Sequence, residues 1–186
     1  MEVDIYTDCG GSNAELGIGI HLMSDEVERS FMIKTSAQDV NKSYGIKSNI
    51  SVGEVHAVLK ALELLEGNIV KVRVFTDSDM TFLILNKLYS NIKRKKNFGT
   101  FELLNEKFLK LKSKFEIDVM WIKGHAGVYG NELSDLLSGK ALRKSVKKDI
   151  LYEVEIPVKK QPVKHIKKQT KIYRWIYLKN ALILIV

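Results

Sequence analysis

Residues 121–142 read WIKGHAGVYGNELSDLLSGKAL, and this stretch carries most of the information about the architecture. The apolar run at 115–122 predicts a strand, a loop with three glycines follows, and a helix is expected over 132–144. His125 lies in the glycine-bearing loop, and Asp135 lies one turn into the helix. Open α/β sheets build their sites where strands end and helices begin, so these two residues are candidates for chemistry.

Outward from this stretch, hydrophobic periodicity predicts the other elements. Strands are expected at 3–8, 17–23, 31–34 and 70–76, and helices at 52–65, 79–91 and 100–114. The predicted order is three strands, a helix, a strand, two helices, a strand and a helix. We therefore expect an α/β fold with a mixed five-stranded sheet flanked by helices.

Length and composition limit the class of protein. The chain has 186 residues, of which 45% are hydrophobic and two are proline, which favours a folded domain over disorder. No apolar run reaches the roughly 20 residues that span a bilayer, and no secretory segment opens the sequence. The single cysteine, Cys9, cannot form an internal disulfide, so we expect no membrane association and a cytoplasmic location.

Charge divides the chain into two parts. Up to residue 92 there are 8 basic and 13 acidic residues (−5), and the remainder has 22 basic and 9 acidic residues (+13), which sum to the net +8. A basic part joined to an acidic part suggests a polyanion held by one part while carboxylates act in the other. Lysine-rich helices that are merely solvated would give the same totals.

Four acids fall where predicted elements end or begin: Asp8, Glu54, Asp77 and Asp135. A single acid at a strand end caps a turn more often than it binds a metal. A group of carboxylates is different, because crowded negative charges are tolerated when cations lie between them, and hard oxygen ligands suit Mg²⁺. Two such ions roughly 3.5–4 Å apart could activate a water and stabilise the leaving oxygen in phosphodiester hydrolysis.

Four sequence blocks carry a family resemblance: YTDCGGS at 6–12, GEVHAVLKALELL at 53–65, VFTDSDM at 74–80, and the stretch quoted above. In this order and spacing they resemble the type 1 ribonuclease H family, over about residues 1–144. The resemblance implies a ribonuclease H-like fold and endonucleolytic hydrolysis of the RNA strand of RNA–DNA hybrids, leaving 5′-phosphate and 3′-hydroxyl ends. It makes residues 1–144 the catalytic domain and leaves 145–186 as a basic, aromatic-containing extension.

The resemblance also implies a role for each site residue. Asp8 would bridge two Mg²⁺ ions, with Mn²⁺ as the alternative metal. Asp135 would complete the site of the ion that activates water, and Glu54 and Asp77 would hold the second ion. His125 would assist proton transfer or release of the 5′-phosphate product.

Two positions depart from the family pattern. Cys9 stands where glycine is expected, and we interpret it as a small buried residue and not a nucleophile. Asp79 stands where a polar group usually touches the minor groove of the hybrid, and a carboxylate there would repel phosphates. Asp77 and Asp79 could instead be read as a metal-binding pair, a weaker interpretation.

Recognition of RNA depends on its 2′-hydroxyl groups and on the shape of the minor groove. The residues expected to contact the hybrid are Gly10, Gly11, Asn49, Ser51 and Asn131, together with the basic loop Lys93, Arg94, Lys95 and Lys96. From Arg143 onward there are 12 basic and 3 acidic residues interleaved with aromatic ones. This composition suits nucleic-acid binding, although the aromatic residues could equally pack a subdomain or contact a partner protein.

Three other functions remain open at this level. The chain could be a hybrid-binding module that has lost catalysis, although all four acids and the histidine loop are present. It could be a DNA nuclease or resolvase on the same fold. Finally, the extension could lead a partner-binding role, with the nuclease core secondary.

Overall fold

The computed structural model describes residues 1–12, 14–44, 50–67, 69–88 and 98–156, and the side chains of Ile50, Ser51 and Phe98 are also outside the description. One compact unit runs from Met1 to Ile156, and a second unit comprises Pro157–Val186. The basic loop at 93–96 and the part of the extension from residue 157 onward lie outside the described residues.

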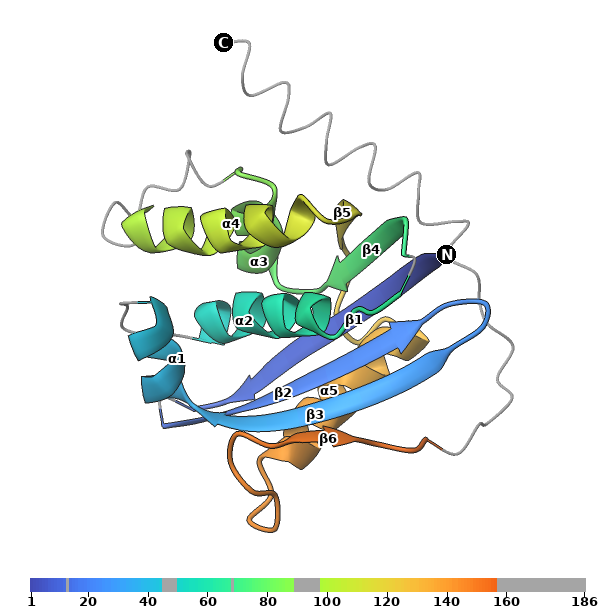
Figure 1. Cartoon of the computed structure of the whole chain (residues 1–186). Helices are drawn as coiled ribbons and strands as arrows, with labels where there is room; N and C mark the ends of the chain where they lie inside the picture. Colours follow the sequence, from blue (N-terminus) through green and yellow to red (C-terminus); the bar gives the residue numbers. More distant parts are fainter. Residues whose placement is uncertain (13, 45–49, 68, 89–97, 157–186) are drawn as a thin grey trace. The chain divides into compact units, whose positions relative to one another are not determined.

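Six strands form one mixed sheet (Figure 1). They are β1 (Glu2–Gly11), β2 (Glu15–Met23), β3 (Glu28–Ser36), β4 (Lys71–Thr76), β5 (Glu116–Trp121) and β6 (Leu151–Glu153), in the spatial order β5-β4-β1-β2-β3-β6. The pairs β1–β2, β2–β3 and β3–β6 are antiparallel, and β1–β4 and β4–β5 are parallel. The predicted α/β fold and mixed sheet are confirmed, with one strand more than the five expected.

The additional strand, β6, lies beyond residue 144, where the sequence placed the end of the domain. It pairs with β3, and Arg29 donates two hydrogen bonds to the carboxylate of Glu153, at 2.7 and 3.0 Å. The compact unit consequently extends to Ile156. The sequence did not predict β6 because the strand has three residues, none of them fully buried, and such a short segment shows no hydrophobic period.

Five helices are described: α1 (Ala37–Tyr44), α2 (Ile50–Glu63), α3 (Asp79–Leu85), α4 (Phe98–Lys112) and α5 (Tyr129–Ala141). Helix α1 was not predicted. Helix α3 was expected to reach residue 91 but ends at Leu85, because the Asn86 side chain donates to the Phe82 carbonyl and Lys87 adopts a left-handed φ of 56°. Among the described helices, none is both long and apolar enough to cross a bilayer.

The two faces of the sheet are covered by different helices, as Figure 1 shows for α2 and α5. Side chains alternate along a strand, so Ile18 and Ile20 of β2 belong to the apolar core with residues of α2, while Gly17 and Gly19, which alternate with them, lie against α5. The same alternation in β1 directs Cys9 toward α2 and Asp8 toward α5. The end of β1 therefore lies between the two helices that carry Glu54 and Asp135.

Candidate active site

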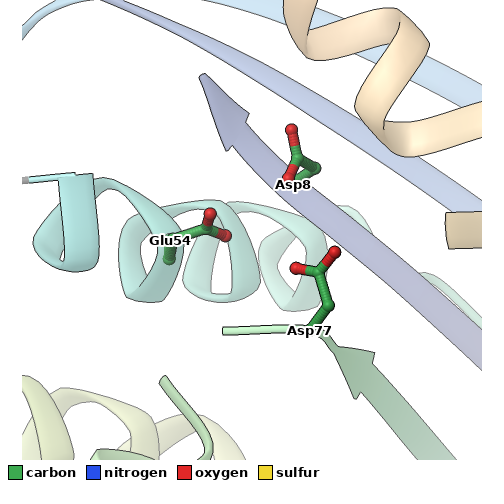
Figure 2. A group of neighbouring side chains, drawn as sticks. All are labelled: Asp8, Glu54 and Asp77. Atoms are coloured by element: carbon green, nitrogen blue, oxygen red, sulfur yellow. The ribbon is translucent and has the colours of Figure 1, made fainter. Parts of the chain in front are cut away.

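Three carboxylates meet at the carboxyl ends of the parallel strands. Asp8 lies on β1, Glu54 on α2, and Asp77 directly after β4, and one oxygen from each lies within 4.8 Å of the others (Figure 2). Strand register explains the meeting of the two aspartates, because each lies two residues beyond the paired Tyr6 and Phe75. Glu54 reaches them from the first turns of α2.

Glu54 is the most buried of the three acids. It is 7% exposed, and its Oε2 atom has no hydrogen-bond partner. Burial raises the pKa of Glu54 well above its usual range, and the charges of Asp8 and Asp77 raise it further. A carboxylate in this state is stabilised by a cation.

Asp8 is held from the α5 side of the sheet. The Ser138 hydroxyl donates to Asp8 Oδ2 over 2.5 Å. Burial raises the pKa of Asp8, the Ser138 hydrogen bond opposes that shift, and the charges of Asp77 and Asp135 add to it. Sequence reasoning missed Ser138, because a serine one turn after Asp135 has no recognisable signal.

Asp77 is fixed by residues of β5 and of α5. Asn131 Nδ2 donates to Asp77 Oδ2 over 3.1 Å, and the Trp121 indole donates to the Asp77 carbonyl over 3.2 Å. A Cβ at Gly124 would lie 2.8 Å from Asp77 Oδ2, so the loop passes close to the carboxylate. Asn131, expected to contact nucleic acid, is 2% exposed and lies against the acidic group; Trp121 was not predicted as a site residue.

Asp135 and His125 lie beside the three carboxylates but are not among them. The charge of Asp135 contributes to the raised pKa values of Asp8 and Glu54. His125 is exposed, has a left-handed φ of 52°, and its Nδ1 lies 3.9 Å from oxygens of both Asp135 and Glu132. Glu132 also accepts a hydrogen bond from the Gly127 amide over 3.1 Å, which ties the loop to α5.

The arrangement fits a divalent metal ion. Three hard oxygen donors converge, Glu54 carries a buried oxygen without a hydrogen-bond partner, and burial opposes the charges of Glu54 and Asp8. Several acids crowded in this way are stable together when a cation compensates them. Within the described residues, Asp8, Glu54 and Asp77 form the group of metal-ligating side chains that the structure supports.

The remaining predicted residues fall into two groups. Gly10 and Gly11 close β1, and Cys9, between Asp8 and Gly10, is 3% exposed with its thiol pKa raised by burial, as expected of an inert residue. The backbone of Ser51 lies in α2, but its side chain is outside the described residues, as are Asn49, Lys93, Arg94, Lys95 and Lys96.

Comparison with known proteins agrees with this geometry. The RNase H family model matches residues 1–143. A ribonuclease H from Trichodesmium erythraeum is 30% identical over 152 residues, covering 77% of this chain and 90% of the relative. A ribonuclease H from Ruthia magnifica is 26% identical over 155 residues, covering 77% and 97%.

Solved structures agree at the level of the fold. RNase H1 from the archaeon Halobacterium salinarum superimposes with a TM-score of 0.57 at 16% identity, covering 76% of this chain and 98% of that structure. The N-terminal RNase H domain of Rv2228c from Mycobacterium tuberculosis gives a TM-score of 0.54 at 16% identity, covering 75% and 95%. The sequence match over residues 1–143, the shared fold and the acidic group agree with one another, and the chain belongs to the RNase H family.

Proposed function

We propose that this protein is a metal-dependent endonuclease that hydrolyses the RNA strand of RNA–DNA hybrids and leaves 5′-phosphate and 3′-hydroxyl ends. The observation that carries the proposal is the group of Asp8, Glu54 and Asp77 at the carboxyl edge of the sheet, with their oxygens within 4.8 Å of one another. Membership in the RNase H family supports the substrate class.

Asp8, Glu54, Asp77 and Asp135 would hold two Mg²⁺ ions, or Mn²⁺ as the alternative. When bound, the two cations would supply activation of the attacking water and neutralisation of charge on the leaving oxygen. The position of Asp8 between α2 and α5 supports its place among the residues that would hold the ions. Asp135 lies 3.9 Å from His125, which supports a joint role for these two residues at the edge of the site.

His125 would act as the proton-handling group of the site. Its side chain is 77% exposed, on a loop whose neighbours Gly124 and Gly127 add no bulk. Its Nδ1 lies 3.9 Å from Asp135, one of the acids that would hold the ions. We expect its removal to slow cleavage less than removal of Asp8, because the carboxylates hold the ions and His125 only moves protons.

The decisive experiment is cleavage of a labelled RNA–DNA hybrid in the presence of Mg²⁺, beside the variant Asp8→Asn. We expect cuts in the RNA strand alone, and loss of most of the cleavage rate in the variant, because one metal ligand is lost. Retained hybrid binding without cleavage in Mg²⁺ or Mn²⁺ would instead identify a binding module.

Duplex DNA of the same sequence is the matched control for substrate class. Cleavage of duplex DNA, and not of the hybrid, would identify a DNA nuclease on this fold and contradict the proposal. Deletion of 157–186, which leaves β6 in place, followed by hybrid affinity against salt concentration measures what this part of the extension contributes, because each lost phosphate contact lowers the salt dependence. Further nucleic-acid or protein contacts through that extension, contacts by the basic loop, and a cytoplasmic location stay predictions from sequence.

A further inference from the structure

The contact between Ser138 and Asp8 joins helix α5 to the strand that carries the central acid. Ser138 is 2% exposed, and its Oγ lies 2.5 Å from Asp8 Oδ2 and 2.8 Å from the Asp135 carbonyl oxygen. One hydroxyl has one proton, so only one of these oxygens receives it. The shorter distance is typical of a hydroxyl donating to a charged carboxylate, which assigns the proton to Asp8.

Close packing of α5 on β2 brings Ser138 to this position. A Cβ at Gly17 would lie 2.1 Å from the Ser138 carbonyl oxygen, and a Cβ at Gly19 would lie 1.9 Å from the Ser134 carbonyl oxygen. Only glycine permits such an approach of helix backbone to strand. Gly10, whose Cβ would be 3.4 Å from Ser138 Oγ, leaves room for the hydroxyl beside Asp8.

We propose that Ser138 is a positioning residue for the metal site: its hydroxyl holds one oxygen of Asp8, so that the other is presented toward Glu54 and Asp77. Ser138 touches neither substrate nor reacting atoms and acts through Asp8. The same residue follows Asp135 by one helical turn, so it also fixes the distance between the two aspartates. This inference rests on the proposed metal-dependent function.

Ser134 provides a matched control within the same helix. It is fully buried, and its hydroxyl donates to the carbonyl of Asn131, three residues earlier, over 2.9 Å. The Ser138 oxygen lies at a similar distance from the carbonyl three residues earlier, but its proton goes to Asp8. The two serines are thus both buried hydroxyls on α5, and Ser134→Ala removes such a hydroxyl without removing a hydrogen bond to a site carboxylate.

The test measures metal binding first and catalysis second. Wild type, Ser138→Ala and Ser134→Ala are titrated with Mn²⁺ alone, and free Mn²⁺ is followed by electron paramagnetic resonance. Loss of a partner that orients a metal ligand typically weakens metal affinity about 10–100-fold, and we expect this range for Ser138→Ala and less than about twofold for Ser134→Ala. The metal concentration for half-maximal cleavage should rise in parallel, with KM for the hybrid unchanged.

Three outcomes would overturn the inference. Unchanged Mn²⁺ affinity in Ser138→Ala would show that Asp8 needs no support, and equal losses in both variants would assign the effect to the helix. A raised KM for the hybrid with unchanged metal affinity would assign Ser138 to substrate binding. Should Ser138→Ala fail to fold, Ser138→Cys keeps the branching of the side chain with a larger atom and a weaker donor, and must also lose affinity.

Failure of this inference is distinguishable from failure of the proposed function. A wild-type protein that binds Mn²⁺ but cuts no hybrid contradicts the proposed function and leaves the binding comparison intact. A wild-type protein that cuts hybrids, with Ser138→Ala indistinguishable from it, contradicts the role of Ser138 alone.

Discussion

The face of the sheet that packs on α2 and the face that packs on α5 are built from opposite kinds of side chain. On the α2 face, large apolar residues such as Ile18, Ile20 and Leu62 interdigitate and keep helix and sheet apart. On the α5 face, Gly17 and Gly19 let the helix backbone rest on the strand. The α2 face stabilises the fold because it buries apolar area. The α5 face has no side chains at these two positions, so the distance between the helix backbone and the strand backbone is short and fixed.

The difference matters for the site because its acids come from both faces. Glu54 projects from α2 out of an apolar layer, where burial raises its pKa. Asp8 points to the α5 side, where the close approach lets a serine hydroxyl reach its carboxylate. Burial on the α2 face thus disfavours the ionised form of Glu54 unless a cation is bound. The hydrogen bond from the α5 face fixes the orientation in which the Asp8 carboxylate would bind that cation.

The largest effect is expected from Gly19→Ala on the α5 face. The new methyl group would lie 1.9 Å from the Ser134 carbonyl oxygen and 2.7 Å from the Ser138 amide nitrogen, both backbone atoms that cannot rotate away. Overpacking costs typically 1–3 kcal/mol and occasionally more, and we expect more than about 3 kcal/mol here because the whole helix must move. The free energy of unfolding from urea titration measures it.

Gly139→Ala is the control for this substitution. Gly139 lies on the exposed side of α5 with nothing within 4 Å of its Cβ position, so alanine should raise stability by about 0.4–1 kcal/mol through its helix preference. A Gly19→Ala protein as stable as wild type would show that α5 does not rest on the strand backbone.

On the α2 face, Leu62→Ala should cost stability by the opposite mechanism. Leu62 is 2% exposed within the apolar core, and its truncation leaves a cavity worth about 2–5 kcal/mol. Leu109→Ala, at a side chain 37% exposed on α4, should cost less than about 1 kcal/mol. Urea unfolding compares the two variants. An equal loss of unfolding free energy in the two variants would contradict the placement of the main core between α2 and the sheet.

The sequence predicted the long elements of this arrangement better than the short ones and better than single contacts between elements. The strands β1, β2 and β4 and the helix α2 repeat apolar residues long enough to reveal their period, and the acids at their ends follow from a motif. Helix α1 has three buried residues, Ala37, Val40 and Tyr44, in eight, which is too weak a pattern. The Ser138 contact depends on how closely α5 approaches β2, a distance that no local pattern encodes.

A smaller effect is expected from His21, which makes the α5 face sensitive to acid. His21 is fully buried; its Nδ1 is hydrogen-bonded to Ser30, its Nε2 lies 3.7 Å from Glu28, and the rings of Tyr129 and Tyr6 pack against it. Burial lowers the pKa of His21 to about 4, and the charge of Glu28 only partly opposes this. The unfolded chain, with a pKa near 6.5, binds the proton first.

Acid therefore lowers the free energy of unfolding, because the unfolded chain takes up the proton at a higher pH than the folded one. The stability contributed by neutral His21 is complete above about pH 6.5 and is lost as the pH falls toward 4, by on the order of 2–3 kcal/mol. Urea midpoints between pH 7.5 and 4 should therefore fall more steeply for wild type than for His21→Asn, which cannot titrate. Parallel curves would show that His21 is solvated and titrates normally.

The smallest effect concerns Cys9 and Gly53, the contact on the α2 face that lies closest to the acids. A Cβ at Gly53 would lie 2.5 Å from Cys9 Sγ and 3.2 Å from Leu16 Cδ1. Alanine is intrinsically better than glycine in a helix by about 1 kcal/mol, so Gly53→Ala sets that gain against the clash. With Cys9 present the clash should prevail, at a net cost of about 1–2 kcal/mol.

Replacement of Cys9 by glycine, the residue expected there from the family pattern, should reverse the sign. In a Cys9→Gly background the thiol is gone, and Gly53→Ala should become neutral or stabilising, which a double-mutant cycle in urea would report as coupling between the two positions. An identical cost of Gly53→Ala in both backgrounds would mean that Leu16, and not Cys9, sets the space. A reversed sign would mean that the Cys9 side chain fits beside the acids because residue 53 has no Cβ. Next to Glu54, the α2 face would then also depend on a glycine for close packing, as the α5 face does.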